Sequence, residues 1–177
     1  MRAESLRKAR DLYGVIVTQA RQQEFYADLG IPDTAAGHYE MIVVHLFVVL
    51  ERLRSEPKAH GTLAQLLIES FVSDMDDSLR EMGAGDMSVP KKVRRAAAGL
   101  YERSGVYREA LAAGDRSALA RPLARYVYDH EDSDWRSEAL AGYVGKAMAG
   151  LLEQDGIQVV AGRIAFPAVG AIGKDVR

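Results

Sequence analysis

The sequence predicts an all-α protein, a single compact bundle of about six helices. Over most of the 177 residues, apolar side chains recur every three or four positions, which is the spacing of one face of an α-helix. Glycine and proline, which interrupt helices, fall between these periodic segments at Pro57, Gly61, Gly83 and Gly114. Hydrophobic residues make up 48% of the chain, so a buried core is expected and intrinsic disorder is not.

The first periodic segment predicts a helix over about residues 2–23. Its inward face is expected to carry apolar residues at helical spacing, namely Leu6, Leu12 or Tyr13, Ile16 and Ala20. A loop that carries Phe25, Tyr26 and Pro32 is expected to follow, because glycine and proline collect in this stretch.

The next helix is expected to start at Asp33 or Thr34, since either side chain can accept from a free backbone N–H group, and to end near Arg54. Residues 41–50 are apolar on all faces, which places this helix at the centre of the bundle. Their β-branched side chains would also suit a strand, but the flanking charges and the length favour a helix. Within this run, His45 is interpreted as a core histidine bonded to a backbone carbonyl or another buried polar group. The alternative is a ligand or an acid–base group.

A third long helix is expected over about residues 62–82. Its inward stripe is predicted from the helical spacing of Leu67, Phe71, Met75, Leu79 and Met82. Gly83 is well placed as a left-handed cap at its end. Ser88 is the expected N-cap of the following helix, with Pro90 in the first turn, and this helix reaches about Ala113.

Two further helices complete the predicted bundle. One carries Leu119, Leu123, Tyr126 and Val127 and is expected to begin or kink at Pro122. The other covers about residues 135–153. A single helical domain is therefore expected to span residues 1–153. Residues 154–177 are expected to form a short extended or hairpin-like tail, in which 157–160 pair with 163–166, packed on the domain or trailing from it.

Composition and charge exclude several classes of protein. The net charge is −2 and the isoelectric point is near 6.1, so no global basic excess attracts DNA, other nucleic acid or anionic lipid. Without cysteine there is no disulfide, thiolate zinc site or cysteine nucleophile. The polar N-terminus lacks the apolar region of a signal peptide, and the longest apolar run is about half of the roughly 20 residues that span a bilayer. A cytoplasmic protein is expected.

An acidic edge is the strongest candidate for a metal site. At 100° per residue, Asp74, Asp77 and Glu81 fall within about 60° of each other, an arrangement that could hold a hard cation. The favoured interpretation is that they neutralise the basic start of the following helix, formed by Lys91, Lys92 and Arg94. A metal-binding or enzymatic helical protein remains the alternative. No catalytic, cofactor or metal residue is assigned, because no histidine, serine or glycine motif has the required spacing.

Two long gapped blocks carry a more specific signal. The first reads Leu12-Tyr13, Ala20-Arg21, Phe25-Tyr26, Pro32-Asp33-Thr34 and Gly37. The second reads Met75-Asp76, Leu79-Arg80-Glu81-Met82-Gly83, Gly85-Asp86 and Val89-Pro90-Lys91, and a weaker match follows at Ala161-Gly162-Arg163 and Phe166-Pro167. In these blocks the sequence resembles the ubiquinol–cytochrome c chaperone family. It departs from the family at His38, where arginine is usual, and at Ser70, where aspartate is frequent.

The resemblance implies a non-enzymatic, all-helical assembly chaperone for the respiratory bc1 complex. It implies that the client is newly made cytochrome b or another bc1 subunit, met near the ribosome exit and with the help of a small partner protein. It also implies peripheral association with the inner membrane of a bacterium. A general helical adaptor is a further alternative.

The family blocks predict the partner-binding surface. Both are junctions between a loop and a helix, where binding residues concentrate, and we expect the segments 25–37 and 75–91 to meet in space. The residues assigned to this surface are Phe25, Tyr26, Pro32, Asp33, Thr34, Met75, Asp76, Arg80, Glu81, Asp86, Lys91 and Lys92.

Overall fold

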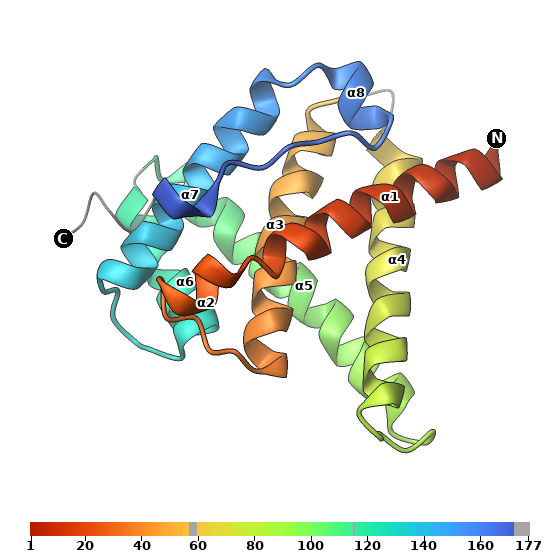
Figure 1. Cartoon of the computed structure of the whole chain (residues 1–177), viewed down its shortest axis with the longest axis horizontal. Coiled ribbons are helices and arrows are strands. Elements are labelled where there is room, and N and C mark those ends of the chain that lie inside the picture. Colours follow the sequence, from red (N-terminus) through yellow and green to blue (C-terminus); the bar gives the residue numbers. More distant parts are fainter. Residues whose placement is uncertain (57–59, 115, 172–177) are drawn as a thin grey trace.

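Six long helices and three short helical segments form the regular structure of the described residues (Figure 1). The computed structural model describes residues 1–56, 60–114 and 116–171, and within these ranges it contains no strand. The elements are α1 (Arg2–Ala20), α2 (Gln23–Ala27), α3 (Ala35–Arg54), α4 (His60–Glu81), α5 (Val89–Ala112), α6 (Arg116–Tyr128), α7 (Trp135–Glu153), α8 (Gly156–Val160) and the 3-10 turn η1 (Val169–Ala171). The predicted all-α class is confirmed. The predicted break at Pro57 lies outside the described residues.

Helix α3 is the centre of the bundle, as its apolar middle predicts. Residues 40–49 are all buried, and α1, α4, α5, α6 and α7 pack around this helix (Figure 1). Thr34 is its N-cap, with Oγ1 accepting from the Gly37 N–H at 3.1 Å. Gly37 must be glycine, because a Cβ there would collide with the carbonyl oxygen of Pro32. The turn of chain before α3 is therefore fixed by close packing against its first turn.

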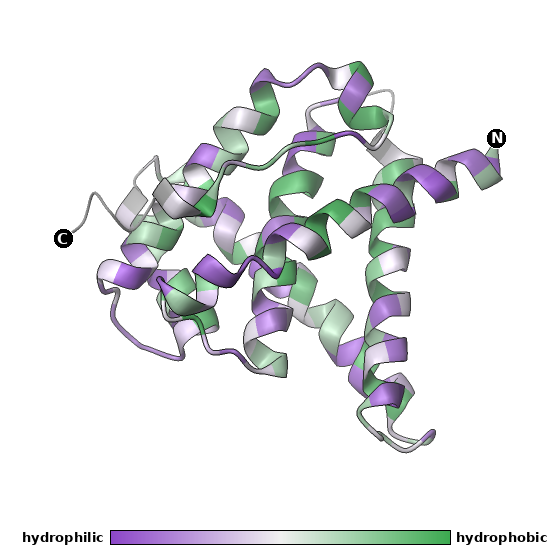
Figure 2. Cartoon of the chain, in the orientation of Figure 1, coloured by the Kyte–Doolittle hydropathy of each residue, from purple (hydrophilic) through white to green (hydrophobic). Residues whose placement is uncertain are grey.

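The C-terminal half of helix α1 packs against the bundle. Figure 2 shows a hydrophilic outer end and a more hydrophobic inner half, and α1 contacts both α3 and α4. The predicted extension of this helix to residue 23 is wrong, because α1 ends at Ala20. Phe25 and Tyr26 lie on the short helix α2 rather than in a loop. The Tyr26 hydroxyl donates to the Ala20 carbonyl at 2.8 Å, which gives the end of α1 a partner that its own helix cannot supply.

Helices α4 and α5 form an antiparallel pair joined by a tight turn. Gly83 has φ +83°, the left-handed conformation that the sequence predicts at this position. Ser88 is the residue before α5, but its hydroxyl donates to the Gly85 carbonyl at 2.9 Å and caps no helical N–H group. Met82 is predicted to point inward, but its side chain is 63% exposed. The apolar face of α4 is no longer covered by the core at the C-terminal end of the helix.

Helix α6 begins at Arg116, so Pro122 is an interior residue and does not start the helix. Helix α7 has the predicted bounds and starts with a capping box, in which the Asp134 carboxylate accepts from the Ser137 N–H and the Ser137 hydroxyl accepts from the Asp134 N–H. Among the described residues, no helix combines the length and apolarity needed to cross a bilayer.

The chain after α7 packs on the bundle, but the predicted hairpin is wrong. Residues 156–160 form helix α8, because the Asp155 carboxylate accepts from the Ile157 N–H and starts a helical turn. The chain then runs in an extended path, and Gln154 pairs with Ala165 through both atoms of its side-chain amide, at 2.8 and 2.9 Å. Phe166 packs edge-on against His45. The last part of the predicted tail, residues 172–177, lies outside the described residues.

Candidate functional site

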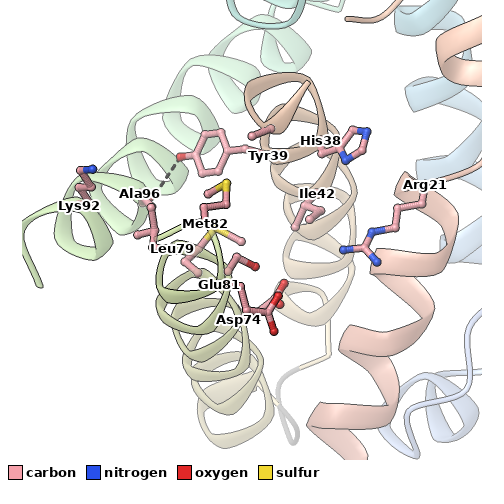
Figure 3. Close-up of a pocket in the computed structure, with 13 residues that line it drawn as sticks. Arg21, His38, Tyr39, Ile42, Asp74, Leu79, Glu81, Met82, Lys92 and Ala96 are labelled. Atoms are coloured by element: carbon pink, nitrogen blue, oxygen red, sulfur yellow. Dashed lines mark hydrogen bonds between the residues drawn. The ribbon is translucent and has the colours of Figure 1, made fainter. Parts of the chain in front are cut away.

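A cavity of about 600 Å³ opens between α3, α4 and α5 (Figure 3). We call it the α3–α4–α5 cavity. Its lining combines apolar side chains with a few charged ones: Arg21, Ala35, His38, Tyr39, Ile42, Asp74, Met75, Ser78, Leu79, Glu81, Met82, Lys92 and Ala96. These residues recur at helical spacing on α3 and on α4, so one face of each helix forms one wall.

Tyr39 fixes the distance between α3 and α5. Its hydroxyl donates to the Ala96 carbonyl at 2.8 Å, and the bond is drawn in Figure 3. Gly99, one turn along α5, leaves room for this ring, because a Cβ there would collide with the Tyr39 hydroxyl. Burial raises the pKa of Tyr39 to about 12, so the hydroxyl stays protonated and remains a donor at neutral pH.

Charged groups stand around the mouth of the cavity. In Figure 3, Arg21 and Lys92 lie on opposite sides, with Asp74 and Glu81 between them on α4. Asp74 accepts from the Tyr13 hydroxyl at 2.6 Å, and burial, reinforced by this carboxylate, raises the pKa of Tyr13. Among the described residues, Arg21, Glu81 and Lys92 form no ion pair within 4.0 Å, so three charges at the mouth are available to a ligand.

His38 joins the first predicted block to the cavity. Its Nε2 lies 2.6 Å from an Asp33 carboxylate oxygen, and its ring packs edge-on against Tyr26. Because His38 lines the cavity, Tyr26 and Asp33 support the cavity wall from behind. In the sequence, His38 is marked only by its departure from the family pattern.

The predicted surface residues separate into three groups. Met75, Glu81 and Lys92 line the cavity. Asp76, Arg80 and Asp86 form an exposed network on the α4–α5 turn, in which Arg80 bridges the two carboxylates at 2.7 Å each. Pro32 and Thr34 shape the start of α3, and Lys91 is exposed outside the lining.

Phe25 does not belong to any surface. Its exposed fraction is 0%, and its ring packs against His45 and Tyr143 in the core. The assignment of Phe25 to a partner-binding surface is therefore wrong, because α2 turns this side chain inward.

The cavity residues that the sequence analysis did not assign are Arg21, Ala35, His38, Tyr39, Ile42, Asp74, Ser78, Leu79, Met82 and Ala96. For several of these residues, helical spacing in the sequence indicates that they share one helix face. On α3 the lining residues follow one another at helical spacing, namely Ala35, His38, Tyr39 and Ile42. The lining residues of α4 have the same spacing.

The acidic edge of α4 does not neutralise the start of α5 through direct ion pairs. No oxygen of Asp74, Asp77 or Glu81 pairs within 4.0 Å with Lys91, Lys92 or Arg94 in the part of the chain that the structure describes. Asp74 and Asp77 instead line a smaller groove of about 350 Å³ between α1 and α4. In the described ranges, no three histidine, aspartate or glutamate side chains are arranged to hold a metal ion.

Comparisons with known proteins agree with the resemblance. The sequence profile of the ubiquinol–cytochrome C chaperone family matches residues 27–166. Ubiquinol-cytochrome-c reductase complex assembly factor 1 of Xenopus laevis is 25% identical over 146 residues, which are 82% of this chain and 72% of the relative. The corresponding protein of Mus musculus is 23% identical over 146 residues, which are 82% of this chain and 49% of the relative, so the match spans about half of the mouse protein.

A solved structure has the same fold. The crystal structure of the Cbp3 homolog from Brucella abortus superposes with a TM-score of 0.83 at 38% identity, covering 93% of this chain and 91% of that chain. The family profile covers most of the sequence, including both predicted blocks from Ala27 onward. The chain belongs to the ubiquinol–cytochrome c chaperone family.

Proposed function

We propose that this chain is a non-enzymatic assembly chaperone for the ubiquinol–cytochrome c reductase (bc1) complex, and that its α3–α4–α5 cavity receives an apolar segment of newly made cytochrome b. Family membership supports the chaperone role, and the relatives are themselves named as assembly factors of this complex. The observation that carries the choice of site is the cavity, which gathers Met75, Leu79 and Met82 on one accessible helix face.

The lining suits temporary binding of an apolar helix. A membrane-protein client exposes apolar surface before it is assembled, and that surface needs a partner outside the bilayer. Methionine adapts to different apolar shapes because its side chain is unbranched and polarizable. Met82 is 63% exposed, so part of the apolar lining is in contact with water. Covering this surface with an apolar client would lower the free energy, because apolar surface is removed from water.

The charged mouth favours release and orientation. The unpaired Arg21, Glu81 and Lys92 remain near water at the edge of the cavity, where charge pairs contribute more to orientation than to affinity. A chaperone must let its client go, so an apolar contact of limited area with a polar rim is suitable. We expect this exchange to take place at the inner membrane of a bacterium, with the chain associated peripherally.

Photo-crosslinking tests the site with a matched pair of positions. A photoreactive amino acid at position 82, in the lining, is compared with one at position 152 on α7, because Met82 and Leu152 are 63% and 61% exposed. After irradiation of cells, the expected result is an adduct with cytochrome b from position 82 only. Equal adducts from both positions, or none from position 82, would show that the cavity is not the client site.

The assembly role has its own test. Leu79→Asp places a charge in the lining, and the spectroscopically measured amount of bc1 complex in membranes is expected to fall several-fold at unchanged protein level. Leu152→Asp is the control, because it makes the same change at an exposed position outside the cavity. Normal bc1 levels in cells that lack this chain entirely would refute the assembly function. A general adaptor would instead capture many unrelated proteins.

A further inference from the structure

The turn between α4 and α5 projects away from the rest of the bundle at the lower edge of Figure 1. We call residues 83–95, the turn and the first turns of α5, the basic tip. At its apex Met87 is 97% exposed, and Lys91, Lys92, Arg94 and Arg95 are exposed behind it. A long apolar side chain in water, next to a group of cations, is a combination that needs a physical explanation.

The four cations form no ion pair within 4.0 Å with any of the described residues. The nearest acidic side chain in sequence, Asp86, is bonded to Arg80, which also holds Asp76. Asp74 and Asp77 line the groove between α1 and α4, and Glu81 lines the α3–α4–α5 cavity. Of these carboxylates, Asp76 is held by Arg80 and the other three on α4 line grooves, so none of them pairs with Lys91, Lys92, Arg94 or Arg95 among the described residues.

Three of the cations share one face of α5. At 100° per residue, Lys91, Arg94 and Arg95 fall within about 100° of one another. Lys92 lies at the edge of this face and lines the cavity. About two turns beyond Arg94 on the same side, Tyr101 is 62% exposed. The face thus presents cations between an exposed methionine and an exposed aromatic ring.

We propose that the basic tip docks the protein on an anionic lipid bilayer. Anionic lipid surfaces attract clustered lysine and arginine residues, and apolar or aromatic side chains at the edge of such a cluster insert between head groups. Single-stranded RNA fits less well, because residues 83–101 contain one aromatic side chain, Tyr101, whereas RNA-binding grooves stack successive bases on several aromatic rings.

This docking places the mouth of the α3–α4–α5 cavity beside the membrane, because Lys92 belongs to both surfaces. The docking deepens the proposed function and rests on the peripheral membrane association stated there, and it is tested with purified protein and lipid alone. If the basic tip does not bind lipid, the proposed chaperone function is unaffected. If the chaperone function is refuted, the basic tip can still bind lipid.

Flotation with lipid vesicles provides the test. The protein is expected to float with phosphatidylcholine vesicles that contain phosphatidylglycerol, to stay behind with pure phosphatidylcholine, and to detach at high salt. Each neutralised cation is expected to weaken partitioning about fivefold, so the double change Lys91→Gln/Arg95→Gln lowers it about 25-fold. The control Arg7→Gln/Lys146→Gln removes the same charge from exposed positions on α1 and α7.

A second pair of variants tests the apex. Met87→Ser is expected to reduce flotation, whereas Leu152→Ser, an equivalent change at an exposed residue of α7, leaves it unchanged. Circular dichroism confirms that all four variants are folded. Absence of flotation, or an equal loss in the tip and control variants, overturns the proposal. It is also overturned if an unstructured RNA oligonucleotide binds the tip and vesicles do not.

Discussion

His45 and Tyr143 form a buried hydrogen bond of 2.8 Å that links α3 to α7. His45 Nδ1 lies 2.7 Å from the Met41 carbonyl, which can only accept, so Nδ1 carries the proton. Nε2 of the neutral ring is then an acceptor, and the Tyr143 hydroxyl donates to it. The Tyr143 oxygen accepts in turn from Gln19 of α1 at 2.9 Å. One chain of polar groups with every donor matched thus joins three helices.

We expect the stability of the protein to fall as the pH is lowered from 7 to 5, because His45 cannot accept a proton while folded. Burial lowers its pKa from 6.5 to about 4. Between these values the unfolded chain binds a proton that the folded chain does not, so acid favours unfolding. At about 1.4 kcal/mol per pH unit, the free energy of unfolding should drop by about 2 kcal/mol between pH 6.5 and 5.

Urea denaturation at a series of pH values measures this slope. His45→Gln removes the titrating group and is expected to flatten the dependence over this range, whatever its effect on absolute stability. His130→Gln, at an exposed histidine, should keep the slope of the unmodified protein. A His45→Gln variant with an unchanged slope would contradict the assignment.

Gly37→Ala is expected to destabilise the fold and to disturb the cavity. The added Cβ meets the Pro32 carbonyl oxygen, a backbone atom that can move only if the start of α3 shifts. Overpacking of this kind costs about 1–3 kcal/mol. Ala35 and His38, which flank Gly37 on α3, line the cavity and would move with it.

Gly14→Ala is the matched control for this change. Gly14 lies inside α1, is exposed and has open space around its Cβ position, so alanine there should stabilise the protein by up to about 1 kcal/mol. Thermal unfolding of the two variants should shift in opposite directions. A neutral Gly37→Ala would mean that the chain before α3 is free to adjust.

Arg103→Leu should be strongly destabilising, because it leaves Glu40 charged and buried without a partner. Arg103 of α5 holds the Glu40 carboxylate of α3 with two bonds of 2.7 and 2.8 Å and packs on Tyr126. Burial raises the pKa of Glu40 even with this partner present. Removing one member of a buried pair typically costs about 3 kcal/mol or more.

The double variant Glu40→Leu/Arg103→Leu checks the reason for this loss. Since it leaves no unpaired charge, it should recover much of the stability that Arg103→Leu loses, as measured by the free energy of unfolding in urea. If the double variant is as unstable as the single one, the loss comes from packing of the arginine stem and not from the isolated carboxylate.

Properties that depend on local spacing could be read from the sequence. The all-round apolar middle of α3 predicted its central position, and the capping residue Thr34 marked where α3 begins. His45 could be assigned to the core because a lone histidine among apolar neighbours must find a buried partner. The left-handed Gly83 followed from the need to end one helix and turn back. Each of these features is decided within a few residues of chain.

The tertiary structure decided which side chains meet. Phe25 and Tyr26 are adjacent in one family block, yet α2 buries the first completely and leaves the second behind the cavity wall. Asp74 was expected beside the cations of α5 and is instead bonded to Tyr13 of α1. Helical periodicity gives the face of each helix but not the rotation and crossing of one helix against another. Those two quantities place Met75, Tyr39 and Lys92 around one cavity and leave the basic tip without a counter-charge, because they are set by packing of the whole core.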